Sequence, residues 1–183
     1  MRKALRTLVL ILSFCSLSHA QTQNRVIEVY TNFTSPEITA LQIVSVTVDG
    51  RPVALNVPFA ADPTWLKTLT FRVRNISGRT LNSLHIGLGF DFAQFNEKAP
   101  RDVAFSLIRG IHGNGHNSRD ASDRRKPILP GEEIDLSLTE KQLSLIQDMA
   151  ERSGMTELKR VKLMPIAFIN FADGSGVKSG ISY

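Results

Sequence analysis

The chain has 183 residues, a formal net charge of +5 and a single cysteine. This length suits one domain with one hydrophobic core. One cysteine excludes a disulfide framework and a paired-cysteine metal site, and no apolar stretch after the first twenty residues is long enough to cross a bilayer as a helix.

Residues 1–20 have the layout of a secretory signal peptide. A basic head, a short apolar run and small residues at the end follow one another as Arg2, Lys3, Arg6, Leu8–Phe14 and Ala20. This order predicts cleavage after Ala20 and a secreted or periplasmic protein. Cleavage removes Cys15 and three basic residues but no acidic one, so the mature chain carries a net charge of only +2. A charge this small disfavours nucleic acid as a partner.

The segment 21–37 is predicted to be an N-terminal lead-in with a possible edge strand. Gln21–Asn24 is polar and is expected to lack regular structure, whereas Arg25–Phe33 has strand character before Pro36 interrupts it. Leu41–Val57 then predicts a hairpin, because Asp49-Gly50 is a type I′ turn pair between two alternating apolar runs.

The stretch from Leu66 to Phe92 has the clearest pattern in the chain. Apolar and polar residues alternate in two runs, of which the apolar members are Leu69, Phe71 and Val73, then Leu84, Ile86, Leu88, Phe90 and Phe92. A period of two predicts two half-buried strands. Asn75, Ser77 and Gly78 between them suit a chain reversal.

A long polar segment separates the next two predicted strands. Val103, Phe105 and Leu107 alternate as a strand, and Ile134, Leu136 and Leu138 alternate as another. Between them, residues 112–130 are rich in glycine, asparagine, serine and charge, and we expect them to form an exposed loop.

The period then changes to that of a helix over residues 139–153. Thr139 and Gln142 have the spacing of a capping box, and Leu143, Ile146 and Ala150 form an apolar stripe that ends before Gly154. We expect this helix to pack across one end of the sheets. A helix that binds a partner or a membrane surface is the alternative, although its polar face lacks a basic bias.

The C-terminal part predicts two final strands. Val161–Phe171 is apolar on both faces, as is typical of an interior strand, and Pro165 should mark a bulge or a break in it. Residues 173–176 (DGSG) form a turn, and Val177–Tyr183 is predicted to return as the last strand.

Together these elements predict a mainly β fold, a two-sheet antiparallel immunoglobulin-like sandwich of about seven or eight strands with one inserted amphipathic helix, over residues 38–183. Three segments carry a resemblance: 71–78 (FRVRNISG), 129–136 (LPGEEIDL) and 171–174 (FADG). They resemble the immunoglobulin-like or fibronectin-like modules of secreted bacterial proteins. The resemblance implies extracytoplasmic binding or scaffolding and no particular site residues, and the cysteine pair of antibody-type domains is absent.

Few residues suggest a site. His112, His116 and Asp120 in the 112–130 loop have side chains that suit zinc or copper, although a solvated loop explains them as well. Four basic residues of the same loop offer a surface for anionic groups, namely Arg119, Arg124, Arg125 and Lys126. Trp65 is either a core aromatic or an exposed stacking platform for a sugar ring or peptide. His85 lies on the outward phase of its strand and is expected at the surface.

No catalytic or cofactor-binding motif is present in the sequence. The chain has no Gly-x-Ser-x-Gly elbow and no phosphate-cradling loop. We therefore expect no enzyme and no cofactor, but a binding or interaction module for an extracytoplasmic protein or glycan. A metal-binding module built on the histidine loop and an unrecognised extracytoplasmic enzyme remain as alternatives.

Overall fold

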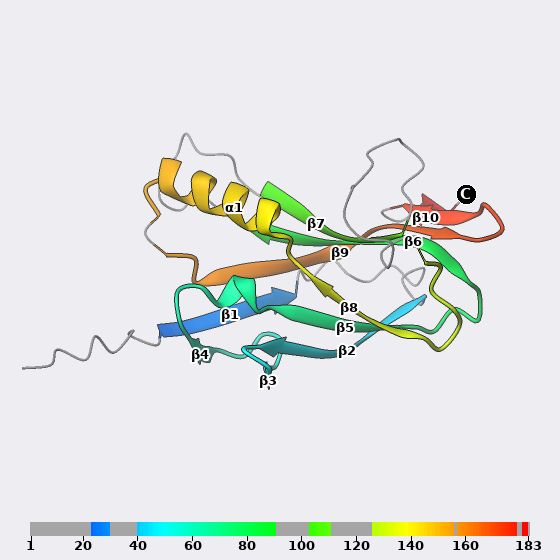
Figure 1. Cartoon of the computed structure of the whole chain (residues 1–183), viewed down its shortest axis with the longest axis horizontal. Helices are drawn as coiled ribbons and strands as arrows, with labels where there is room; N and C mark the ends of the chain where they lie inside the picture. The colour runs from blue at the N-terminus through cyan, green and yellow to red at the C-terminus, as the bar shows by residue number, and fades with distance from the viewer. Residues whose placement is uncertain are drawn as a thin grey trace, which may run out of the picture.

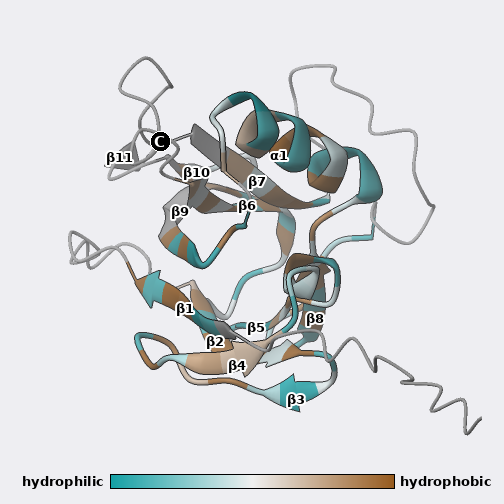
Figure 2. Ribbon diagram, turned by 90° about the vertical axis from the view of Figure 1, so that its left-hand side faces the viewer, coloured by the Kyte–Doolittle hydropathy of each residue, from teal (hydrophilic) through white to brown (hydrophobic). Residues whose placement is uncertain are grey.

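The computed structural model describes residues 23–29, 40–90, 103–110, 126–155, 157–178 and 181–182. In these ranges the protein is mainly β, with two sheets and one α-helix. The strands lie in two layers, which is consistent with a β-sandwich, and the helix lies beside β7 (Val103–Gly110) of the upper layer (Figures 1 and 2).

The smaller sheet has four antiparallel strands in the order β3-β2-β5-β8. Their bounds are Arg51–Pro52 for β3, Leu41–Val48 for β2, Thr70–Asn75 for β5 and Glu133–Ser137 for β8. Asp49 and Gly50 join β2 to β3 with φ values of 51° and 71°, so the predicted type I′ turn is confirmed.

The larger sheet has seven strands around β9. Their bounds are Gln23–Val29 for β1, Phe59–Ala61 for β4, Leu81–Phe90 for β6, Val103–Gly110 for β7, Arg160–Phe171 for β9, Gly176–Lys178 for β10 and Ile181–Ser182 for β11. On one side β9 pairs with β6, which in turn pairs with β7. On the other side its first residues pair with β1 and its last residues with β10. This confirms β9 as an interior strand.

The two central strands differ in burial. Phe71 and Val73 of β5 are buried whereas Arg72 and Arg74 are exposed, so the half-buried prediction is confirmed there. It is wrong for β6, where every residue from Ser83 to Phe90 is buried. His85 is therefore not at the surface, and its ring contacts that of Phe168 edge-on, with centroids 5.5 Å apart.

The strand arrangement corrects the sequence prediction in two respects. The described residues form eleven strands instead of seven or eight. Four of them, β3, β4, β10 and β11, have only two or three residues, which is too short for an alternating pattern to be visible in the sequence. The sheet is also not purely antiparallel, since β1 runs parallel to β9 with Val26 opposite Arg160 and Val29 opposite Leu163.

The N-terminal prediction is also corrected. Strand β1 begins at Gln23, within the segment expected to lack structure. It is not an edge strand, because β4 pairs with its other side, with Gln23 opposite Ala61. Residues 30–37 of the predicted lead-in lie outside the described residues.

Three further boundaries differ from the prediction. The return strand of the first hairpin stops at Pro52 and does not reach Val57. The last strand is divided into β10 and β11, which pair with each other. Ile128, assigned to the exposed loop, is buried and bridges to Leu81, since both of its backbone groups bond to that residue.

Pro165 has the predicted effect on β9. The β6·β9 ladder shifts register between the Ile86–Ile166 and Leu88–Leu163 pairs, and Pro165 lies in that interval. Proline cannot donate a ladder hydrogen bond, which explains the irregularity at this point.

The helix α1, Glu140–Arg152, confirms the prediction closely. Thr139 and Gln142 form the capping box, with Thr139 Oγ1 accepting from Gln142 N at 3.2 Å. Gly154 after the helix has a φ of 74°, the left-handed conformation expected there. The described helices lack the length and apolar character that a bilayer span requires.

A short 3-10 turn, η2 (Trp65–Lys67), connects β4 to β5 and faces α1. Trp65 and Leu66 of this turn and Ile146 and Ala150 of the helix belong to the same buried core. Gln142 also ties α1 to the sheet, since its Nε2 donates to the Ser106 carbonyl of β7 at 2.7 Å. The helix thus closes the end of the fold where η2 lies.

Candidate functional site

Most of the residues that the sequence suggested for a site lie outside the described part of the chain. This applies to His112, His116 and Asp120 of the metal hypothesis and to Arg119, Arg124 and Arg125 of the basic surface. Lys126 is described and is exposed. Within the described ranges, no group of three or more histidine, cysteine or acidic side chains is placed to hold a metal ion.

Trp65 is part of the core. Its side chain is 0% exposed, its Nε1 donates to the Leu158 carbonyl at 2.8 Å, and its ring contacts Phe59 edge-on at 5.5 Å. The core interpretation is therefore correct, and the indole does not offer a stacking surface to a ligand.

The described part of the chain has a different concave site, a groove between α1 and η2 with a volume of about 290 Å³. We call it the helix–turn groove. Its floor consists of apolar side chains from η2 and from α1 with the residues that follow it, two segments that are distant in the sequence, namely Leu66, Leu143, Ile146, Ala150, Met155 and Leu158. A small apolar cavity of this kind suits a few side chains of a partner better than a large ligand.

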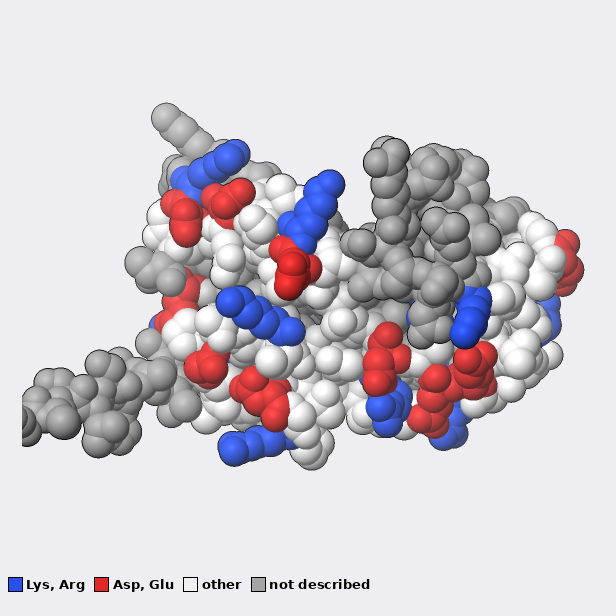
Figure 3. Space-filling model, viewed as in Figure 1, with Lys and Arg blue, Asp and Glu red and all other residues white. Residues whose placement is uncertain are grey.

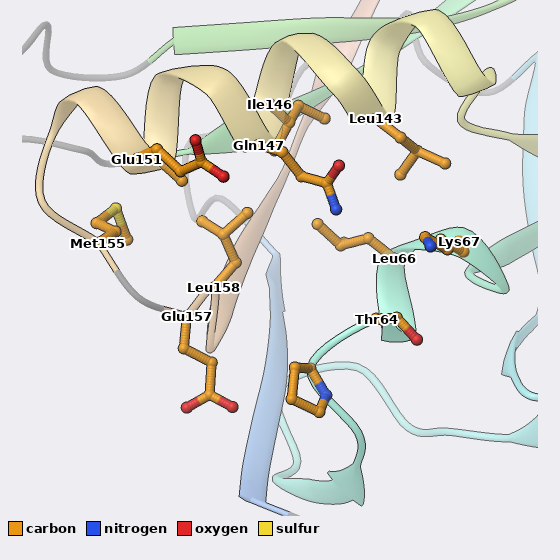
Figure 4. A pocket seen from close by; sticks show the side chains of 12 residues that line it. Thr64, Leu66, Lys67, Leu143, Ile146, Gln147, Glu151, Met155, Glu157 and Leu158 are labelled. Atoms are coloured by element: carbon orange, nitrogen blue, oxygen red, sulfur yellow. The ribbon is translucent and has the colours of Figure 1, made fainter. Parts of the chain in front are cut away.

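Polar groups surround this floor. The remaining lining residues are Pro63, Thr64, Lys67, Gln147, Glu151 and Glu157. Glu151 and Glu157 lie toward one end of the groove and Lys67 toward the other, with the Gln147 amide between them (Figure 4). The groove is therefore apolar at its base and oppositely charged at its two ends.

Glu157 is held by a buried arginine. Arg25 of β1 is 0% exposed and forms an ion pair with Glu157, and its Nη1 also donates to the Leu158 carbonyl at 3.3 Å. The same carbonyl accepts from Trp65. These bonds anchor residues 157 and 158 to β1 and η2, so that end of the groove is rigidly attached to the core.

Glu151 and Lys67 are placed differently. Both are exposed, and neither forms an ion pair with any residue that the structure describes. Both side chains are therefore accessible to a ligand in the groove.

On the outer face of β5 and β8, in contrast, charges are paired across the two strands. Arg72 Nε donates to Asp135 Oδ1 at 2.8 Å, and Arg74 bonds to Glu133 in the same way. The bond from Arg72, opposed by a smaller cost of burial, lowers the pKa of Asp135. On the described part of one face, basic and acidic side chains are interspersed and do not gather into a patch of one sign (Figure 3).

The lining of the groove contains few types of polar group. Its lining has no histidine, cysteine or serine, and its one hydroxyl, that of Thr64, donates to Asp62 Oδ1 at 2.8 Å. It does offer apolar contact, one amide and three charged side chains, which are the kinds of group that fix a ligand in a pocket. Comparison with protein-family models, curated proteins and solved structures finds no match to this chain.

Sequence reasoning found only one wall of this groove. The stripe of Leu143, Ile146 and Ala150 predicts the apolar face of the helix, but nothing in the sequence indicates that η2 faces it. Arg25 was assigned to an edge strand, and a lone arginine in a polar context gives no signal of burial.

Proposed function

We propose that this protein is a non-catalytic extracytoplasmic interaction module of the immunoglobulin-like or fibronectin-like type, and that it binds a partner protein at the helix–turn groove. One observation carries the proposal: a buried apolar floor lies between two charged side chains, Glu151 and Lys67, that have no partner among the described residues. Sites for recognition combine such a floor with a few polar groups that set orientation.

The lining favours a protein over a glycan. Sugar rings bind best against the face of an aromatic side chain, and none of the groove residues is aromatic. The single tryptophan is in the core. Aliphatic side chains with a methionine among them suit the apolar side chains of a polypeptide instead.

The proposal also includes export of the protein from the cytoplasm. If residues 1–20 are a cleaved signal peptide, the module acts outside the cytoplasm and its chain begins at Gln21. The intact mass of the protein recovered from the extracytoplasmic fraction tests this point. Recovery of a form that retains Met1 would contradict it.

Site-specific photo-cross-linking tests the groove. A photoreactive residue replaces Gln147, which is exposed in the groove, or Lys141, which is exposed on the same helix outside it. In native envelopes, position 147 should cross-link to one protein identified by mass spectrometry, and position 141 should not. The adduct should decrease when Ala150→Phe fills the groove of a protein with an unchanged circular dichroism spectrum. Equal cross-linking at both positions, or none at 147, would overturn the proposal.

A further inference from the structure

The two unpaired charges of the helix–turn groove differ in sign and in position. Glu151 lies on the last turn of α1, and Lys67 lies beyond the other end of the apolar floor, next to Leu143 of the first turn (Figure 4). A ligand along the groove therefore meets a negative group at one end, apolar atoms in the middle and a positive group at the other end.

The rise of the helix gives an estimate of the distance between the two ends of the groove. Leu143 and Glu151 are eight residues apart on α1, roughly 12 Å at about 1.5 Å per residue. Four steps of an extended chain, at about 3.3 Å each, cover roughly the same distance. In an extended chain the side chains at i, i+2 and i+4 lie on one face, so three consecutive side chains of that face can meet Glu151, the floor and Lys67.

The direction of α1 supports the same polarity. The C-terminal end of a helix carries partial negative charge and the N-terminal end partial positive charge. Glu151 stands at the C-terminal end of α1, whereas Lys67 lies near its first turn. The helix and the two side chains therefore favour a cation and an anion at the same respective ends.

We propose that the groove binds an extended segment of the partner protein with a basic side chain at i, an apolar side chain at i+2 and an acidic side chain at i+4, or the same three in reverse order. This inference rests on the proposed function and specifies the chemistry of its partner. The basic side chain pairs with Glu151, the apolar side chain contacts Leu66, Leu143 and Leu158, and the acidic side chain pairs with Lys67.

Blocked pentapeptides provide the probe. The peptide acetyl-Lys-Ala-Leu-Ala-Asp-amide carries the three side chains on one face, and its affinity for the mature protein is measured by NMR titration. Replacing its leucine by alanine should weaken binding about tenfold, because the apolar side chain no longer fills the floor. Replacing its lysine by norleucine, or its aspartate by asparagine, should weaken binding roughly two- to five-fold, as for exposed ion pairs.

Double-mutant cycles assign each charge to its partner. Once Glu151→Gln is made in the protein, the lysine-to-norleucine change in the peptide should have no further effect, and Lys67→Gln should do the same for the aspartate change. The crossed combinations should remain additive. Glu140→Gln and Lys141→Gln are matched controls, since they remove the same charges from exposed positions on α1 outside the groove and should leave the affinity unchanged.

The outcomes separate this inference from the function on which it rests. Cross-linking at position 147 without peptide binding, or equal losses in the groove and control variants, would overturn the inference and leave the module function intact. Failure of both experiments would overturn both. Tighter binding of the free tripeptide Ala-Leu-Ala than of the blocked peptide would overturn the inference, because it would show that the groove binds a small peptide and not a segment of a protein.

Discussion

On the outer face of β5 and β8, Arg72 and Arg74 each bond to the acid directly opposite, Asp135 and Glu133. At the helix–turn groove, the side chains of Glu151 and Lys67 form no ion pair with any described residue. The first pair of strands satisfies its charges across an antiparallel ladder, where opposite residues lie about 5 Å apart. The groove has apolar side chains between its charges, so those two charges do not reach each other.

The difference shows how charge can be used in a chain with a small net charge. Ion pairs across β5 and β8 favour one register and leave little for a partner to bind. Charges that remain unpaired beside an apolar floor do not stabilise the fold in this way, and a ligand can bind to them. Four experiments test this contrast, from the largest expected effect to the smallest.

The largest loss of stability is expected from a core residue of β5, on the face of the strand opposite its ion pairs. Phe71 of β5 is 0% exposed, and Phe71→Ala should lower the free energy of unfolding by about 4 kcal/mol, through lost apolar burial and the cavity left behind. Urea denaturation measures this loss. Ile76→Ala, at a 48% exposed position just after the strand, is the control and should change stability by less than about 0.5 kcal/mol. Equal effects would show that the core has been assigned to the wrong face.

The buried pair at the groove comes next. Glu157→Ala leaves the guanidinium of Arg25 buried without its carboxylate, and we expect a loss of about 3 kcal/mol. The double variant Arg25→Met, Glu157→Leu removes both charges and should recover most of that loss. Denaturation of the single and double variants completes the cycle, and additive losses would contradict the pairing.

A third test concerns acid stability at the β9–β10 turn. The backbone amide of Ser175, helped by Arg79 and the Ser175 hydroxyl, lowers the pKa of Asp173 from 3.8 to about 2. A depressed pKa in the folded state means that the carboxylate stabilises the fold above pH 3.8, and that this contribution is lost as the pH falls toward 2. The stability of wild type should therefore fall more steeply over this window than that of Asp173→Asn.

Ser175→Ala is the matched variant for this test. It removes the hydroxyl bond but keeps the backbone bond from Ser175 to Asp173, 3.0 Å long, which is the largest cause of the shift. Its melting temperature should show a pH dependence between those of wild type and Asp173→Asn. Identical acid profiles for all three proteins would refute the assignment.

The smallest effect on stability is expected at the groove rim. Glu151 stands in the last turn of α1, where a negative charge opposes the helix dipole. Glu151→Gln should therefore leave stability unchanged or raise it by roughly 0.3 kcal/mol, while it weakens binding of the pentapeptide. Thermal denaturation and peptide titration of the same variant make the comparison. A clear loss of stability would place Glu151 with the structural charges of β5 and β8.

Several parts of the fold could be predicted from the sequence because their causes are local. The alternation in β5, the positive φ of Asp49 and Gly50, and the capping box of Thr139 and Gln142 each depend on a few neighbouring residues. A periodic pattern also identified the apolar side of α1 and so found one wall of the groove. These features are determined by side-chain period, turn conformation and the unpaired amides at a helix start.

Other features depend on contacts between distant segments. The pattern of β6 indicates one buried face, yet residues 83–90 are buried on both faces. Strand β1 pairs with β9 more than 130 residues away. The burial of Arg25 became possible only when β1 placed it beside Glu157 and the Leu158 carbonyl.

The amino-acid sequence by itself therefore determined the β class, the hairpin turn and the helix with its cap. Only the tertiary structure decided the parallel pairing of β1 with β9, the burial of both faces of β6 and the groove between α1 and η2. The physical reason is that local conformation follows from steric and hydrogen-bonding preferences of adjacent residues, whereas the choice of partner strand depends on how the whole chain buries its apolar surface. Lys67 and Glu151 are separated by 84 positions, and no local preference could bring them to the two ends of one groove.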